Sequence, residues 1–322
     1  LLLVFILFTQ LLRGVSDTVS PLLALMLSTS LGLLLTPALA WLAYAGNPLP
    51  QGLAAPQAPG RCDAIDWHAL ELGEVLGQGA SGVIHRVQVA GRKAALKLYK
   101  GQMTSDGSPL NEMQACVAAG AHPNLIPLLG QVANHPHQVP GLLMALVGTH
   151  LSALAGPPSL QTCTRDVYPP DLCLGLQAAT RLATAIASVA AHLHQRGITH
   201  GDLYAHNILW NPESGEAMLS DFGAATLLPV GRPDLRRALQ ALEVRALGCL
   251  LEELALAVQS SSPTSDHTPW VQKSGPSSTA DVSTADAAVQ TLQALARACL
   301  SAQPRQRPNA AEVAQALQTL KP

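Results

Sequence analysis

The stretch Ile198–Gly223, ITHGDLYAHNILWNPESGEAMLSDFG, contains three side chains that can act together on a phosphate chain. Asn207 follows Asp202 by five residues, and Asp221 stands after a predicted short hairpin. Mg²⁺ prefers oxygen ligands in octahedral geometry, so an amide and one carboxylate can hold it while the other carboxylate faces an incoming hydroxyl. Phosphoryl transfer depends mostly on positioning and on neutralising charge, and the stretch therefore predicts a phosphoryl-transfer site.

The same stretch resembles the catalytic segment of the protein kinase family, whose signatures are H-R-D-L-x-x-x-N and D-F-G. By this resemblance Asp202 is the catalytic carboxylate, and Asn207 and Asp221 are the ligands of Mg²⁺. The resemblance implies an α+β, two-lobed protein kinase-like fold, with a small β-rich N-lobe and a helical C-lobe. The implied activity is transfer of a phosphoryl group from ATP to Ser or Thr hydroxyls of a protein substrate.

A glycine-rich segment, EVLGQGASGVIHRVQV, lies well upstream between two runs typical of β-strands. We assign Gly77, Gly79, Gly82 and Val83 to the spacing G-x-G-x-x-G-x-V. Glycines let a backbone close over phosphates without Cβ clashes. The same spacing also opens dinucleotide-binding folds, but there a helix should follow, whereas here a strand-like run follows. By resemblance the segment, with Leu76 before it, contacts ATP.

The resemblance assigns further roles in the N-lobe. Lys97, at the end of A-A-L-K, is similar to the lysine that contacts the α- and β-phosphates, and Lys100 is a weaker competitor for that role. Glu112, in a predicted helix over Pro109–Ala119, is similar to the glutamate that pairs with this lysine. The adenine slot is expected to be formed by Ala95, Met144, Leu146, Val147 and Leu209.

The C-lobe is expected to begin with a long helix over Leu172–Arg196, capped by Gly197. Glu243 begins a stretch that resembles a later helix of the family, in which an aspartate usually stands at this position. No A-P-E motif follows Gly223, and the segment before Glu243 is short because only 19 residues separate the two. Residues 258–290 are rich in Ser, Thr and Pro and predict a disordered insert.

Two substitutions in the catalytic stretch depart from the family pattern. Gly201 replaces the arginine that grips a phosphate on the activation loop, and Tyr204 stands where a lysine normally neutralises the γ-phosphate. Two other functions therefore stay open. H-G-D-L-x-x-x-N also resembles aminoglycoside and choline phosphotransferases, which act on small molecules, and the two substitutions fit a pseudokinase that only binds partners.

The N-terminal region predicts an attachment to a membrane. Leu22–Ala45 contains 24 residues without a charge, enough for a transmembrane helix, although a buried core helix or a signal peptide is the alternative. We therefore expect a membrane-spanning region of one or more helices at 1–46 and a linker at 47–66. The kinase-like domain follows at 67–322, with an N-lobe at 67–147 and a C-lobe at 148–322. Because it needs ATP, this domain is expected on the cytoplasmic side.

Composition excludes one further class of function. The chain has a net charge of −2, with 12% charged and 48% apolar residues, and shows no basic footprint for nucleic acid. Its six cysteines are scattered and form no C-x-x-C pair, so we expect reduced thiols.

Overall fold

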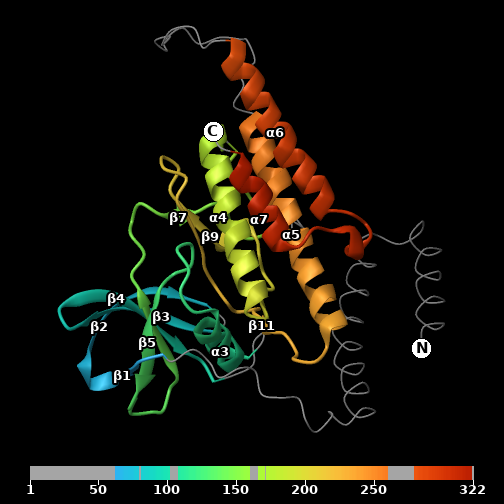
Figure 1. Cartoon of the computed structure of the whole chain (residues 1–322). Helices are drawn as coiled ribbons and strands as arrows, with labels where there is room; N and C mark the ends of the chain where they lie inside the picture. Colours follow the sequence, from blue (N-terminus) through green and yellow to red (C-terminus); the bar gives the residue numbers. More distant parts are fainter. Residues whose placement is uncertain are drawn as a thin grey trace, which may run out of the picture. The chain divides into compact units, whose positions relative to one another are not determined.

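The computed structural model describes residues 62–79, 81–101, 108–159, 166–170, 172–259 and 279–320, which belong to one compact unit (Figure 1). The predicted membrane-spanning region and most of the predicted linker lie outside these residues. Within the described ranges, no helix has both the length and the apolar composition needed to cross a bilayer.

A six-stranded sheet forms the N-lobe, in the order β1-β5-β6-β4-β3-β2. Only β1 and β5 pair in parallel, and the other neighbours are antiparallel. The strands are β1 (Ala64–Asp66), β2 (Leu70–Gln78), β3 (Gly82–Val89), β4 (Arg92–Tyr99), β5 (Leu128–Ala133) and β6 (Gly141–Ala145), and the short 3-10 helix η1 (Trp67–Ala69) separates the first two. The predicted β-rich N-lobe is confirmed.

Strand β4 lies inside this sheet and presents different residues to its two faces. Side chains alternate along a strand. Ala94 and Leu96 therefore join the core of the sheet with Val87 and Leu143. The intervening Ala95 and Lys97 turn toward the other face, where the cavity described below opens. Alternate residues of the A-A-L-K run thus belong to the core of the sheet and to the wall of the cavity.

Helix α3 (Pro109–Ala119) covers that second face and has the predicted bounds. Pro109 suits the first turn, because the missing N–H is one that a helix start leaves unpaired anyway. Val117 packs with Tyr99 and Leu142 of the sheet in a small buried cluster. This packing turns Glu112 inward, where its side chain is 3% exposed.

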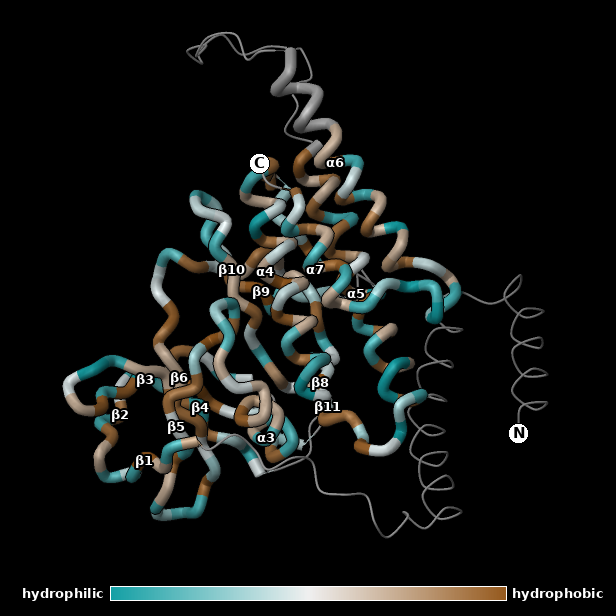
Figure 2. The backbone as a smooth tube through the Cα atoms, viewed as in Figure 1, coloured by the Kyte–Doolittle hydropathy of each residue, from teal (hydrophilic) through white to brown (hydrophobic). Residues whose placement is uncertain are grey.

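Helices dominate the C-lobe, as predicted, and α4 is its centre (Figure 1). One face of α4 is almost continuously buried, including Leu182, Ile186 and Leu193. Hydrophobic and hydrophilic residues alternate along the C-lobe helices in Figure 2, as expected for helices with one buried face. The helices are α4 (Leu176–Gln195), α5 (Pro233–Gln259), α6 (Thr279–Cys299) and α7 (Ala310–Thr319), with a 3-10 turn η3 (Pro304–Gln306).

The helix boundaries correct two predictions. Helix α4 begins at Leu176 instead of Leu172, and its C-terminal end is followed by Gly197 at φ 72°, a conformation that favours glycine. The predicted disordered insert at 258–290 is wrong at both ends, because α5 runs to Gln259 and α6 begins at Thr279. The Ser/Thr content of 279–290 masked a helix that continues into the buried Leu292 and Ala296. Residues 260–278 lie outside the described ranges.

Small strands hold the catalytic stretch against α4. The predicted hairpin is confirmed as β9 (Ile208–Trp210) and β10 (Ala217–Leu219), and β7 (Ser152–Ala153) pairs with β9. Further pairing joins β8 (Ile198–Thr199) to β11 (Thr226–Leu227). A 3-10 turn, η2 (Ala205–Asn207), leads into β9. These pairings place the two ends of the catalytic stretch side by side.

Candidate active site

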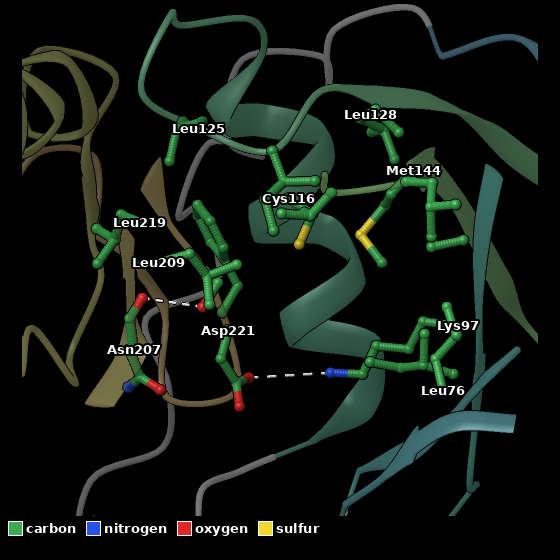
Figure 3. A pocket seen from close by; sticks show the side chains of 18 of the residues that line it. Leu76, Lys97, Cys116, Leu125, Leu128, Met144, Asn207, Leu209, Leu219 and Asp221 are labelled. Atoms are coloured by element: carbon green, nitrogen blue, oxygen red, sulfur yellow. Dashed lines mark hydrogen bonds and ion pairs between the residues drawn. The ribbon is translucent and has the colours of Figure 1, made fainter. Parts of the chain in front are cut away.

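A cavity of about 660 Å³ is lined by both lobes and contains most of the residues singled out from the sequence. Its walls come from the N-lobe sheet, α3, the segment after β6 and the catalytic stretch (Figure 3). The predicted site residues in its lining are Leu76, Ala95, Lys97, Glu112, Met144, Leu146, Val147, Asn207, Leu209 and Asp221.

The glycine-rich segment requires one correction. Ile84 lines the cavity and Val83 does not, because neighbouring residues of β3 point to opposite faces. Counted from Gly77, the last position of G-x-G-x-x-G-x-V in fact falls on Ile84. Gly77, Gly79 and Gly82 are not in the cavity lining either. A glycine is required at position 82 for a local reason, because a Cβ there would overlap the carbonyl oxygen of Leu98.

Lys97 and Glu112 form a buried ion pair at the inner wall of the cavity. Their side chains are 11% and 3% exposed, so solvent screens the pair little. Tyr99 donates a hydrogen bond of 3.3 Å to the same Glu112 oxygen, and burial raises the pKa of Tyr99, which keeps this donor protonated. The other oxygen, Glu112 Oε2, is buried with no hydrogen-bond partner among the described residues. An unpaired acceptor of this kind fits a site that receives a polar ligand.

Across the cavity, Asp221 Oδ1 lies 3.9 Å from Lys97 Nζ (Figure 3). Asp221 has φ 55°, a left-handed conformation, and its Oδ1 accepts a hydrogen bond of 3.0 Å from the N–H of Gly223. The left-handed backbone therefore occurs at a functional residue, where such strain is often found. The carboxylate is 57% exposed and open to a ligand.

The carboxylate of Asp202 is held by Asn207. Asn207 Nδ2 donates to the backbone oxygen of Asp202 at 2.9 Å and to Oδ2 at 2.8 Å. These bonds use the amide nitrogen and leave the amide oxygen for another partner. Asn207 and Asp221 thus offer the oxygen donors that Mg²⁺ prefers, and the residues present fit this metal. Asp202 itself is not part of the cavity lining, but it is hydrogen-bonded to Asn207, which is.

A separate set of buried contacts fixes the backbone of the catalytic stretch. His200 donates to the carbonyl oxygen of Ser220 at 3.0 Å, and its ring meets Phe222 edge-on at 5.2 Å between centroids. Glu243 accepts from the N–H of Gly201 at 2.8 Å and lies 2.7 Å from His194 Nε2. Glu243 therefore anchors the catalytic stretch to α5. From the sequence this residue is notable only because it stands where the family usually has an aspartate.

The partner of Arg307 follows from the fold. Arg307, which follows the 3-10 turn η3, donates to the carbonyl oxygens of Ala241 at 2.7 Å and Ser301 at 2.9 Å. These bonds tie the segment between α6 and α7 to α5.

The sequence analysis did not identify several residues of the site, among them Tyr99. Cys116 lines the cavity on α3, one helical turn from Glu112, and burial raises the pKa of its thiol to about 12. The only signal was the four-residue spacing on one helix face. His206 and Asp166 contact each other beside Asp202, and Asp166 lies in a Pro-rich loop whose pattern gives no indication of this role.

Comparisons with known proteins agree with this geometry. A family model described as "Protein kinase domain" matches residues 70–237, from the start of β2 into α5. CBL-interacting protein kinase 22 of Oryza sativa subsp. japonica is 30% identical over 172 residues, covering 48% of this chain and 35% of that protein. Serine/threonine-protein kinase mos of Xenopus laevis is 30% identical over 172 residues, covering 52% and 45%.

A longer match covers more of the chain. Probable serine/threonine-protein kinase kinY of Dictyostelium discoideum is 24% identical over 295 residues, covering 80% of this chain and 48% of that protein. The chain thus spans less than half the length of these three relatives. The family match includes Lys97, Glu112, Asn207 and Asp221, which line one cavity, and Asp202, which is hydrogen-bonded to Asn207. The chain belongs to the protein kinase domain family.

Proposed function

We propose that this chain transfers the terminal phosphoryl group of ATP to Ser or Thr hydroxyls of a protein substrate. The observation that carries the proposal is the buried Lys97–Glu112 pair, with Asp221 3.9 Å from the same lysine nitrogen. A lysine held in this way by a buried carboxylate is fixed for contact with phosphates. The match of residues 70–237 to the protein kinase family model, which includes Lys97, Glu112 and Asp221, supports the assignment.

The cavity provides separate regions for the two ends of ATP. Lys97 at the inner wall would contact the α- and β-phosphates, and the backbone at Gly77, Gly79 and Gly82 would close over them. Asn207 and Asp221 hold Mg²⁺, and bound Mg²⁺ spreads the negative charge of the phosphates. The adenine ring lies in the apolar slot formed by Leu76, Ala95, Met144, Leu146, Val147 and Leu209.

Asp202 is the group that accepts the proton of the attacking hydroxyl. Asn207 occupies Oδ2 of Asp202, which leaves Oδ1 for the substrate. As the hydroxyl oxygen bonds to the γ-phosphorus, its proton passes to Asp202 and ADP departs. General bases of this kind contribute about 10²- to 10⁴-fold to a rate.

A small-molecule acceptor is the second candidate, because little chain is present to support a peptide. Helix α5 begins at Pro233, so residues 224–232 alone connect Gly223 to it. A pseudokinase is the third candidate and rests on Gly201 and Tyr204.

One assay separates the three candidates. The full chain is incubated with labelled ATP and Mg²⁺ in the presence of casein, a mixed protein acceptor or an aminoglycoside, and label is followed in each. We expect label in proteins and none in the aminoglycoside, and Asp202→Ala should remove it. Label only in the aminoglycoside would establish the second candidate. Nucleotide binding without transfer to any acceptor would establish the third.

We also propose that Leu22–Ala45 tethers the chain to a membrane, with the kinase domain on the cytoplasmic side. The support is sequence alone: 24 uncharged residues, ending near Trp41 and Tyr44, which suit a membrane interface. Reporter fusions after Gly60 test the orientation. A reporter that is active only on the outer side would overturn both the orientation and the enzymatic role, because the domain needs cytosolic ATP.

A further inference from the structure

A buried carboxylate on the segment before α4 holds the histidine next to Asn207. The side chain of Asp166 is 2% exposed and accepts two hydrogen bonds from His206, from the backbone N–H at 3.0 Å and from ring Nδ1 at 2.8 Å. Because an ionised carboxylate only accepts, Nδ1 carries a proton in this bond. Asp166 therefore fixes both the backbone and the ring orientation of His206.

The fold holds Asp166 in place through the next residue. Gly156 and Val167 exchange two backbone hydrogen bonds of 2.9 Å, which form a bridge between the chain after β7 and the chain before α4. Asp166 is adjacent to this bridge, so its position is set by backbone pairing. The Asp166 side chain is thus held beside His206 at the active site.

The far side of the His206 ring faces the catalytic carboxylate. His206 Nε2 lies 3.5 Å from Asp202 Oδ2, and the ring is 20% exposed. Tyr204 stacks on the ring at 6.0 Å between centroids and an interplanar angle of 17°. The tyrosine that departs from the family pattern thus packs against His206.

Asn207 and His206 both contact the Asp202 carboxylate at the same oxygen, Oδ2. Asn207 Nδ2 donates to Oδ2 at 2.8 Å, and His206 Nε2 approaches Oδ2 as well. Catalytic hydrogen bonds are often long before substrate is bound and shorten in the reactive complex. A carboxylate held through Oδ2 presents Oδ1 to the acceptor hydroxyl.

We propose that Asp166 and His206 are positioning residues that orient Asp202 for proton acceptance, an inference that rests on the proposed phosphoryl transfer. The chain of contacts runs from Asp166 through the two ring nitrogens of His206 to Asp202, and because both carboxylates only accept, the ring that makes both contacts carries a proton on each nitrogen. The proposal predicts that the ring acts on Asp202 through Nε2. A purely structural role for Asp166 would need only its contact with Nδ1.

His206→Asn separates these two roles. The asparagine amide nitrogen can take the place of Nδ1 and still donate to Asp166, but the side chain is too short to reach Asp202. We expect kcat to fall by about 10- to 100-fold, the cost of a misplaced catalytic group, while the KM for ATP and the melting temperature stay close to wild type. Glu213→Ala, which removes an exposed carboxylate from the β9–β10 turn, should retain the wild-type kcat.

A double-mutant cycle tests the coupling. Asp166→Ala should lower kcat in the wild type and add little in a His206→Ala background, because both changes interrupt one chain of contacts. Independent losses that multiply would show that Asp166 only secures the loop, which overturns the proposal. A ¹⁵N NMR spectrum of the full chain without nucleotide gives a readout besides activity: His206 Nδ1 should carry a proton in wild type and lose that preference in Asp166→Ala.

The outcomes separate this inference from the proposed function. If wild type transfers phosphate and His206→Asn has the same kcat, the positioning proposal alone is overturned. An unprotonated Nδ1 in wild type would overturn it in the same way. If wild type transfers no phosphate to any acceptor, the proposed function and this inference are both overturned.

Discussion

Gly201 and Glu243 join the catalytic stretch to α5: the N–H of Gly201 donates a hydrogen bond of 2.8 Å to Glu243 Oε1. The other oxygen of Glu243 lies 2.7 Å from His194 Nε2 on α4. Glu243 and His194 are 6% and 8% exposed, so one buried carboxylate ties α4, α5 and the loop before Asp202 together. The position of Asp202 therefore depends on a contact far away in the sequence.

Removing this carboxylate should destabilise the C-lobe. Glu243→Ala leaves the Gly201 N–H and the His194 ring without their acceptor, at a cost of about 1–3 kcal/mol for each unsatisfied buried group. Glu243→Gln keeps one acceptor oxygen and should cost less. Urea unfolding of both variants measures the difference, with the exposed Arg245→Gln on the same helix as a control. Unchanged unfolding in Glu243→Ala would contradict the anchoring role.

Replacing Gly201 with any residue that has a side chain should destabilise the protein. Its φ is 79°, and a Cβ there would overlap the carbonyl oxygen of Ala224. Gly231 provides a matched control, because its φ is 84° but a Cβ would have nothing within 4 Å. We expect Gly231→Ala to cost about 1–2 kcal/mol from backbone conformation alone. Gly201→Ala should cost more in urea unfolding and should also lower the initial rate of phosphoryl transfer. Equal costs would show that the overlap is relieved locally.

The elements that the sequence predicts well are those whose determinants are local. Helix α3 has the predicted bounds, and the hairpin after Asn207 is present, because caps, turns and side-chain spacing are all short-range features. Val83 illustrates the limit of this reasoning, because a miscount of one residue on a strand moves a side chain to the opposite face.

Contacts between distant residues could not be predicted in this way. Asp166 meets His206 across 40 residues, and nothing in the Pro-rich loop distinguishes this aspartate from a solvated one. The sequence presents Gly201 only as the absence of an arginine, whereas in the fold a Cβ at this position would overlap the carbonyl oxygen of Ala224. Such a steric requirement can be recognised only once the pairing of β8 with β11 is known.

Lys97 should be needed for nucleotide binding. Adding Mg-ATP to wild type should raise the melting temperature, because a ligand at 100 times its Kd stabilises the folded state by about 2.7 kcal/mol. Lys97→Met should lose most of this rise. Lys100→Met is the control, because Lys100 is exposed and donates to the carbonyl oxygen of Gly79 at 2.9 Å without lining the cavity.

The comparison must use the ligand-induced rise in each variant. Lys97→Met also leaves Glu112 buried without its cation, which lowers the melting temperature before any nucleotide is added. If millimolar Mg-ATP raises the melting temperature of Lys97→Met as much as that of wild type, Lys97 does not contact the phosphates.

Acid should weaken the junction between α3 and β5 through His122. Burial, and then the neighbouring His192, lower the pKa of His122, and its Nδ1 accepts the N–H of Asn124 at 3.1 Å. The folded state therefore prefers the neutral ring. The stability contributed by this preference is fully present above the usual histidine pKa of about 6.5 and is lost as the pH falls through the lowered folded-state value.

His122→Asn isolates this contribution, because its amide oxygen can accept the same N–H and does not titrate near neutral pH. Urea unfolding is measured for both proteins at neutral pH and at successively lower pH. Wild type should lose more stability than the variant over that range. Parallel curves would show that His122 does not contribute to the acid sensitivity.

Phosphorylation of the short segment after Gly223 should not be required for activity. Thr226 is the single hydroxyl residue between Ala224 and Leu242, it is exposed, and Gly201 offers no guanidinium to pair with a phosphate there. Thr226 follows Asp221 by five residues, so a phosphate there is expected to repel that carboxylate and the nucleotide and not to order the segment. We expect Thr226→Ala to retain most of the initial rate of phosphoryl transfer, whereas Asp202→Ala and Asp221→Ala each lose nearly all of it. A Thr226→Ala protein as inactive as Asp221→Ala would show that this hydroxyl is part of the activation mechanism.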